Sequence, residues 1–135
     1  MTKKLYEELG GLDKLQEIIN EFVNRMFDDV MIGFFFRKAD RQRIKEKEFE
    51  FAAQFLGADI KYTGQALTEA HQKHAIMGGQ FSRRKQIFKE TLEKYNVPKE
   101  VIEALLEHTE NFRLAITKTK NSVCNNQLAI KKTDN

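Results

Sequence analysis

Apolar residues early in the chain recur at intervals of three and four positions, which is the spacing of one face of an α-helix. Between residues 12 and 27 this stripe is continuous, and its members are Leu12, Leu15, Ile18, Ile19, Phe22, Val23, Met26 and Phe27. A half-buried strand would instead alternate apolar and polar residues over about four to eight positions. The pattern therefore predicts one long amphipathic helix over residues 12–27.

Three further helices follow from the same spacing. Asp40 stands where an N-cap side chain accepts a free backbone amide, and a helix is expected to follow it. One face of that helix carries Ile44, Glu48, Phe51, Ala52 and Phe55. The next helix is marked by Phe81, Phe88, Leu92 and Tyr95, with Arg84 on its apolar face. The last opens near Pro98, whose fixed φ suits a first turn, and runs through Ile102, Leu105, Leu106, Thr109, Phe112 and Ile116.

No strand pattern and no internal repeat is visible, so the expected fold class is all-α. Shorter helical pieces are expected around Tyr6 and His71, beside the four main helices. From Thr117 onward the sequence is rich in Asn, Lys and Thr and has no amphipathic period. We therefore expect one helical domain over residues 1–118 and a flexible tail over residues 119–135.

Composition narrows the class of protein. With 41% hydrophobic and 32% charged residues and one Pro in 135 positions, the chain is expected to be globular. The single Cys124 rules out a disulfide scaffold and a Cys-based metal site. No apolar run is long enough to cross a bilayer, so no membrane contact and a cytoplasmic location are expected. Residues after position 116 supply the whole net charge of +3, and a neutral remainder argues against nucleic-acid binding.

Histidines and phenylalanines are the candidates for chemistry. Leu67, His71 and His74 are spaced i, i+4 and i+7, so both imidazoles share the helix face that Leu67 would bury. A single His on such a face is more often a hydrogen-bonded core residue than a ligand. Eleven Phe and no Trp would supply the wall of a pocket or simply the filling of a small core. These residues alone leave both interpretations open.

The order of several short motifs is more specific than any one of them. They are Leu5-Tyr6-Glu7-Glu8-Leu9-Gly10-Gly11, Phe22, Phe35-Phe36, Leu56-Gly57, Tyr62-Thr63-Gly64, His71, Ile76, Phe81 and Val97-Pro98. In this order the chain resembles the group I truncated haemoglobins over residues 5–116. The resemblance implies a truncated globin fold, a two-over-two helical sandwich that encloses haem.

The resemblance also implies roles for particular residues. His71 matches the proximal histidine, the axial ligand of the haem iron. Lys47 matches a basic position that reaches a haem propionate, with a solvated surface lysine as the alternative. His74 would contact a propionate or simply pack in the core, and Arg84 would contact a propionate or extend to solvent. Apart from the resemblance, His108 is expected at the surface of the last helix. The apolar haem wall would consist of Phe35, Phe36, Ile44, Phe51, Leu67, Ile76, Phe81 and Phe88.

Two positions depart from the family pattern on the ligand-facing side. Val23 stands where many members carry a Tyr that donates to bound oxygen, and Glu48 stands where a Gln or a small polar residue is common. Burial would favour a protonated Glu48 that donates to the ligand, so that ligand affinity rises as pH falls. The alternatives are an outward Glu48 paired with Arg41, Lys45 or another base, or Lys47 or Glu48 as the sixth iron ligand.

The implied function is reversible binding of diatomic gases, oxygen or nitric oxide, at the iron of haem b (iron protoporphyrin IX). Nitric oxide dioxygenation is also implied by the family, but it requires stabilised oxygen, and Val23 weakens it. A reductase stays open as a protein partner. The rival hypothesis is a haem-free or haem-sensing globin-like module that acts through partners bound by the Lys-rich tail. The absence of a long heptad pattern predicts a monomer.

Overall fold

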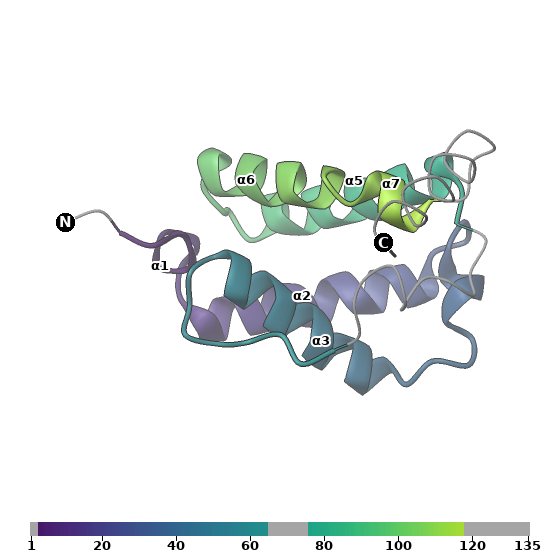
Figure 1. The fold of residues 1–135 in the computed structure, drawn as a ribbon, viewed down its shortest axis with the longest axis horizontal. Helices are drawn as coiled ribbons and strands as arrows, with labels where there is room; N and C mark the ends of the chain where they lie inside the picture. Colours follow the sequence, from purple (N-terminus) through teal and green to yellow (C-terminus); the bar gives the residue numbers. More distant parts are fainter. Residues whose placement is uncertain (1–2, 65–75, 118–135) are drawn as a thin grey trace, which may run out of the picture.

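The structure is a computed structural model that describes residues 3–64 and 76–117, and within these ranges all regular structure is helical (Figure 1). The all-α prediction is therefore confirmed. Leu67, His71, His74 and the tail over residues 119–135 lie outside the described residues. The elements are α1 (Leu5–Leu9), α2 (Leu12–Asp28), the 3-10 helix η1 (Gly33–Phe36), α3 (Arg41–Phe55), α5 (Gly78–Lys94), α6 (Lys99–Glu110) and α7 (Arg113–Ile116).

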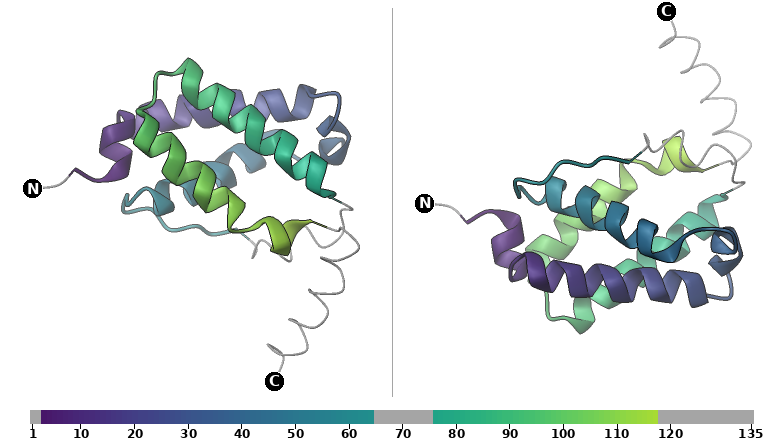
Figure 2. Two further views of the ribbon diagram at one scale, coloured as in Figure 1. Left: turned by 90° about the horizontal axis from the view of Figure 1, so that it is seen from above. Right: turned by 90° about the horizontal axis from the view of Figure 1, so that it is seen from below.

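The long helices form two layers of two. α2 and α3 lie side by side in one layer, and α5 and α6 lie across them in the other (Figure 2). α1 closes one end of this sandwich, where its Tyr6 backbone amide donates to the carbonyl of Leu56 at 3.1 Å. α2 contacts α1, η1, α3 and α5, and so it is the helix around which the others are arranged.

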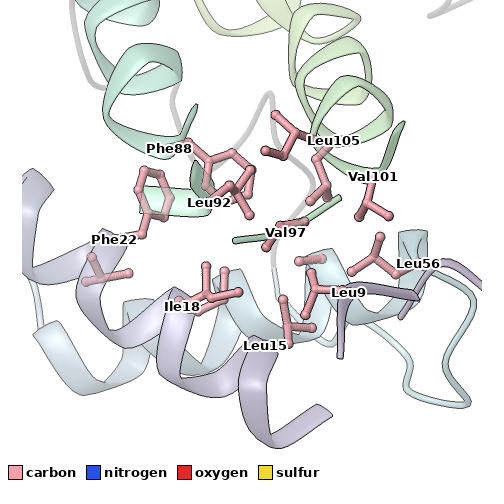
Figure 3. Close-up of a cluster of buried hydrophobic side chains, with 14 of the residues drawn as sticks. Leu9, Leu15, Ile18, Phe22, Leu56, Phe88, Leu92, Val97, Val101 and Leu105 are labelled. Carbon is pink, nitrogen blue, oxygen red and sulfur yellow. The ribbon is translucent and has the colours of Figure 1, made fainter. Parts of the chain in front are cut away.

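The stripe read in the sequence of α2 explains this central place. Its buried residues are Leu15, Ile18, Ile19, Phe22, Val23 and Met26. Two of them, Leu15 and Ile18, belong to a cluster of aliphatic side chains from both layers that we call the aliphatic core (Figure 3). Its members are Leu9, Leu15, Ile18, Leu56, Leu92, Val97, Val101 and Leu105, none of them more than 6% exposed. Burial of this much apolar surface is the main stabilising contribution to the fold.

Helix ends follow local chemistry. The carboxylate of Asp40 accepts the backbone amide of Arg43 at 3.2 Å, which confirms the N-cap expected there. The chain leaves α1 through Gly10 at a φ of 126°, a region that L side chains avoid. Pro98 occupies the N-cap position of α6 and not its first turn. No helix in residues 3–64 or 76–117 is long and apolar enough to span a bilayer.

The prediction of one continuous last helix is wrong. α6 ends at Glu110, and after a turn at Asn111 and Phe112 the short α7 begins at Arg113. Arg113 donates to the carbonyl of Gly78 at 3.1 Å and to Ser82 Oγ at 3.0 Å, both on α5. These contacts between helices bend the chain where the apolar spacing alone continues without interruption.

Candidate functional site

The described apolar residues predicted to line a pocket come from four elements, α2, η1, α3 and α5, and from the chain just before α5. Phe35 and Phe36 of η1 are half-buried, and the Phe36 ring stacks on Phe27 with centroids 4.9 Å apart. Ile44 and Phe51 of α3 are half-buried, as is Ile76 just before α5. The fully buried members of this set are Val23 on α2 and Phe81 and Phe88 on α5. The predicted wall residues of η1 and α3 thus keep apolar surface that the described residues do not bury.

A second group of rings, which we call the aromatic cluster, lies where α3 faces α6. It consists of Phe51, Phe55, Tyr62, His108 and Phe112, all half-buried. The His108 ring lies parallel to that of Phe55, with centroids 3.9 Å apart and an angle of 14° between planes. Phe51 contacts Tyr62, His108 and Phe112 at centroid distances of 5.2 to 5.6 Å. Such aromatic pairs stabilise beyond the area that they bury.

The expectation that His108 lies at the surface is wrong. Its half-buried ring is held among aromatic neighbours, and burial lowers the pKa of His108 below its ordinary value, which favours the neutral imidazole. A sequence signal existed, because Leu105, His108 and Phe112 share one helix face by their spacing. Burial also raises the pKa of Tyr62 in the same cluster.

Glu48 and Arg84 form an ion pair between α3 and α5. Arg84 Nη2 donates to both carboxylate oxygens of Glu48, at 2.9 and 3.1 Å, and each side chain is 27% exposed. The Arg84 guanidinium also lies over the Phe22 ring, 5.0 Å from its centroid. Glu48 is thus paired with a base, and that base is Arg84, whereas its predicted place on the ligand-facing side stays a prediction.

Polar side chains of α3 hold the loop that follows it. Gln54 Oε1 accepts the backbone amide of Tyr62 at 2.6 Å, and Glu50 accepts the amide and the hydroxyl of Thr63 at 3.0 and 2.8 Å. These hydrogen bonds, with Lys47 nearby, hold the pKa of Glu50 below its ordinary range. Lys47 Nζ donates to Thr63 Oγ1 at 2.7 Å and lies 3.5 Å from the Glu50 carboxylate. Lys47 is therefore not a free surface lysine: it pairs with Glu50 and binds Thr63, in the loop after α3.

A different ion pair fixes the turn after α2. The Asp29 side chain is 6% exposed and accepts the backbone amides of Met31 and Ile32 together with two N–H groups of Arg83. The Arg83 hydrogen bonds are the largest cause of a pKa of Asp29 below its ordinary value. A shallow hollow of about 410 Å³ beside this pair is lined mainly by charged side chains, and the predicted haem wall lies elsewhere. Arg83 and Arg84, adjacent in sequence, therefore bind acids in different places, Asp29 in the turn after α2 and Glu48 on α3.

The described residues fit a haem better than a bare metal ion. No three His, Cys, Asp or Glu side chains within residues 3–64 and 76–117 gather as a ligand set for an ion. A porphyrin brings four iron ligands of its own and needs apolar walls with surface still to bury. Half-buried Phe36, Ile44 and Phe51 offer such surface. His71, the expected iron ligand, lies outside the described residues.

Comparisons with known proteins agree with this fit. The model of the bacterial-like globin family matches residues 4–118. A group 1 truncated haemoglobin of Mycolicibacterium paratuberculosis is 28% identical over 102 residues, which cover 76% of this chain and 75% of that protein. A Synechocystis group 1 truncated haemoglobin is 28% identical over 102 residues, covering 73% of this chain and 82% of that protein.

Solved structures give the same fold. The truncated haemoglobin of Tetrahymena pyriformis, in its Fe(III) form, superposes with a TM-score of 0.81 at 23% identity, covering 87% of this chain and 100% of that one. The 2/2 haemoglobin of Synechococcus, with covalently attached haem, gives a TM-score of 0.78 at 21% identity, covering 84% and 98%. The two layers of two helices in this chain are therefore the arrangement of truncated 2/2 globins.

Proposed function

The chain belongs to the bacterial-like globin family, and from this premise we propose that it binds haem b and takes up diatomic gases reversibly, oxygen or nitric oxide. The observation that carries the proposal is the family match over residues 4–118 together with the two-over-two arrangement of α2, α3, α5 and α6. Bound haem would supply an iron with an open coordination position, where a diatomic gas can bind. No amino-acid side chain can bind such a gas reversibly.

In this proposal His71 is the proximal ligand, because a neutral imidazole is a good donor to haem iron. The apolar wall excludes water, which slows oxidation of the iron and favours retention of a flat apolar cofactor. Phe36, Ile44 and Phe51 support this role, since each has surface that the described residues leave half-exposed. The other proposed wall residues are Phe35, Leu67, Ile76, Phe81 and Phe88.

Three basic residues were candidates for the haem propionates. Lys47 keeps that role in the proposal, because its ammonium group meets the loop at Thr63, directly before the segment that carries His71. His74 is a second propionate candidate from that segment. Arg84 pairs with Glu48 and lies over the ring of Phe22, the neighbour of Val23, so we place it on the ligand-facing side and not at a propionate. Val23 and Glu48 remain the residues proposed for the ligand-facing side.

Hemin titration of the purified chain tests the proposal. We expect uptake of one equivalent with a Soret band, and a shift of that band when carbon monoxide is added to the reduced protein. His71→Ala should abolish or greatly weaken the band, whereas His74→Ala, the matched control three residues away, should retain it. A chain that takes up no hemin, or a His71→Ala variant with an unchanged spectrum, would overturn the proposal and favour the haem-free module.

A further inference from the structure

We propose that the Arg84–Glu48 ion pair forms a polar wall on the side of the haem where the gas ligand binds. There Arg84 attracts anionic ligands of the iron, and the Glu48 carboxylate weakens this attraction. This inference rests on the haem site proposed above. It assigns a specificity-determining role to Arg84, a residue that the sequence pattern offered only as a propionate partner or a surface side chain. The argument starts from the place of the pair in the fold.

Both partners interrupt an apolar stripe. Arg84 lies on the face of α5 that carries Phe81 and Phe88, both at most 5% exposed. Glu48 lies on α3 between Ile44 and Phe51, one turn from each. Partly desolvated charges are costly, and an apolar pair of the same volume at such a place is often equally stable or more stable. Stability alone therefore gives no reason for an ion pair at this position.

The pair also reaches the element that carries Val23. The guanidinium lies 5.0 Å from the ring centroid of Phe22, the neighbour of Val23 in α2. Side chains of α2, α3 and α5 thus converge at one point, with Arg84 over an aromatic face that favours a cation. Val23 has no polar group, so Arg84 and Glu48 are the polar side chains at this convergence that we assign to the ligand.

The geometry of the pair leaves Arg84 able to serve a ligand. A guanidinium carries five N–H donors in a planar fork, and both hydrogen bonds to Glu48 run through Nη2. We assign Nε and Nη1 to the ligand. A guanidinium favours a negatively charged ligand over a neutral one, whereas the Glu48 carboxylate repels it. The balance between these two charges would set the preference for anions.

Ligand titrations of the ferric, haem-loaded chain test this balance at one pH near 7. Arg84→Met should weaken the binding of fluoride and azide by about tenfold or more, because a charge-assisted hydrogen bond is lost and a carboxylate is left uncompensated. Glu48→Gln should strengthen the binding of both anions. Carbon monoxide binding to the reduced protein, a neutral probe, should change by less than about twofold in either variant.

Two more variants keep the test decisive. Arg83→Met removes the adjacent arginine, which pairs with Asp29, and should leave fluoride and azide binding unchanged. Arg84→Lys keeps the charge but loses the planar fork, so it should weaken anion binding less than Arg84→Met does. If Arg84→Met does not fold, the other two variants still test the inference: Arg84→Lys should lower the affinity for fluoride and azide, and Glu48→Gln should raise it.

The outcomes separate this inference from the function beneath it. A chain that takes up no hemin overturns both. If the chain binds hemin through His71, two results overturn the role of the pair alone. One is that substitution of Arg84 and Glu48 leaves the anion affinities unchanged, and the other is that the anion and carbon monoxide affinities change together. Opposite shifts in anion affinity for Arg84→Met and Glu48→Gln, with carbon monoxide affinity unchanged, support it.

Discussion

The aliphatic core and the aromatic cluster are built on different principles. The core joins α1, α2, α5 and α6 through aliphatic side chains that are almost completely buried. The aromatic cluster joins α3 to α6 through rings that are all half-buried, and it includes two titratable groups, Tyr62 and His108. The core needs nothing more to be complete, whereas the cluster retains apolar surface that a prosthetic group could bury. The comparison predicts that the core governs folding and the cluster governs cofactor retention.

Truncation of a core residue should have the largest effect. Leu15 has no exposed surface, so Leu15→Ala leaves a cavity and should lower the free energy of unfolding by about 3 kcal/mol. Chemical denaturation of the haem-free protein measures this. Leu114→Ala, at a leucine that is 59% exposed, should change stability by less than about 0.5 kcal/mol. Equal losses in the two variants would mean that the core is not packed as described.

Truncation in the aromatic cluster should separate stability from haem retention. Phe51→Ala removes a half-buried ring, so it should lower the free energy of unfolding of the haem-free protein by only about 1 to 2 kcal/mol, less than a fully buried Phe would. The same variant should lose hemin faster, as followed by transfer to an excess of a second haem-binding protein. Phe34→Ala on η1, at a 46% exposed ring, is the control. Unchanged hemin transfer in Phe51→Ala would refute the difference between the regions.

Acid should weaken the ion pairs of Glu110 with Arg113 and Lys85, which lie next to the aromatic cluster, whereas the aliphatic core has no group to titrate. Hydrogen bonds from Arg113, and then from Lys85, lower the pKa of Glu110 from 4.5 to about 2. A depressed folded-state pKa means that the stabilisation is present above pH 4.5 and is lost as pH falls towards 2. Because Glu110 is 40% exposed, solvent screening should keep this loss below about 1 kcal/mol. Unfolding measured between these pH values should depend less on pH in Glu110→Gln.

His108 should give the smallest effect. Burial lowers its pKa below the ordinary value of 6.5, so the folded state favours the neutral ring. Its stabilisation is therefore present above pH 6.5 and is lost as pH falls through the folded-state pKa. Unfolding experiments from about pH 7.5 to about pH 5 should show a small loss of stability that His108→Phe removes. Leu15→Ala should retain this pH dependence, because the aliphatic core has no titratable side chain.

Sequence reasoning found those features that depend on local chemistry. The spacing of apolar residues identified α2 almost to its ends, and the short polar side chain of Asp40 identified the start of α3. The break after Glu110 was missed because it depends on hydrogen bonds from Arg113 to α5, and apolar spacing carries no information on such contacts. A prediction from periodicity alone therefore extended the helix too far.

The candidate site divides in the same way. The sequence marked Glu48 and Arg84 as charges within apolar stripes, but it could not show that they pair, because the pairing depends on how α3 and α5 are placed across α2. His108 was misjudged although, in the continuous helix predicted from the sequence, its spacing from Leu105 and Phe112 puts all three on one face. The haem-binding residues remain predictions, and those for Leu67, His71 and His74 lie outside the described residues.

The hydrogen bonds from α3 to the loop after it also affect how this helix can change during evolution. Glu50 and Gln54 are polar residues outside the aliphatic core, yet their side chains accept hydrogen bonds from the backbone amides of Thr63 and Tyr62. Substitutions there should be tolerated only when an acceptor of similar reach remains. In a randomised library of α3, these two positions would therefore retain a narrow set of residues.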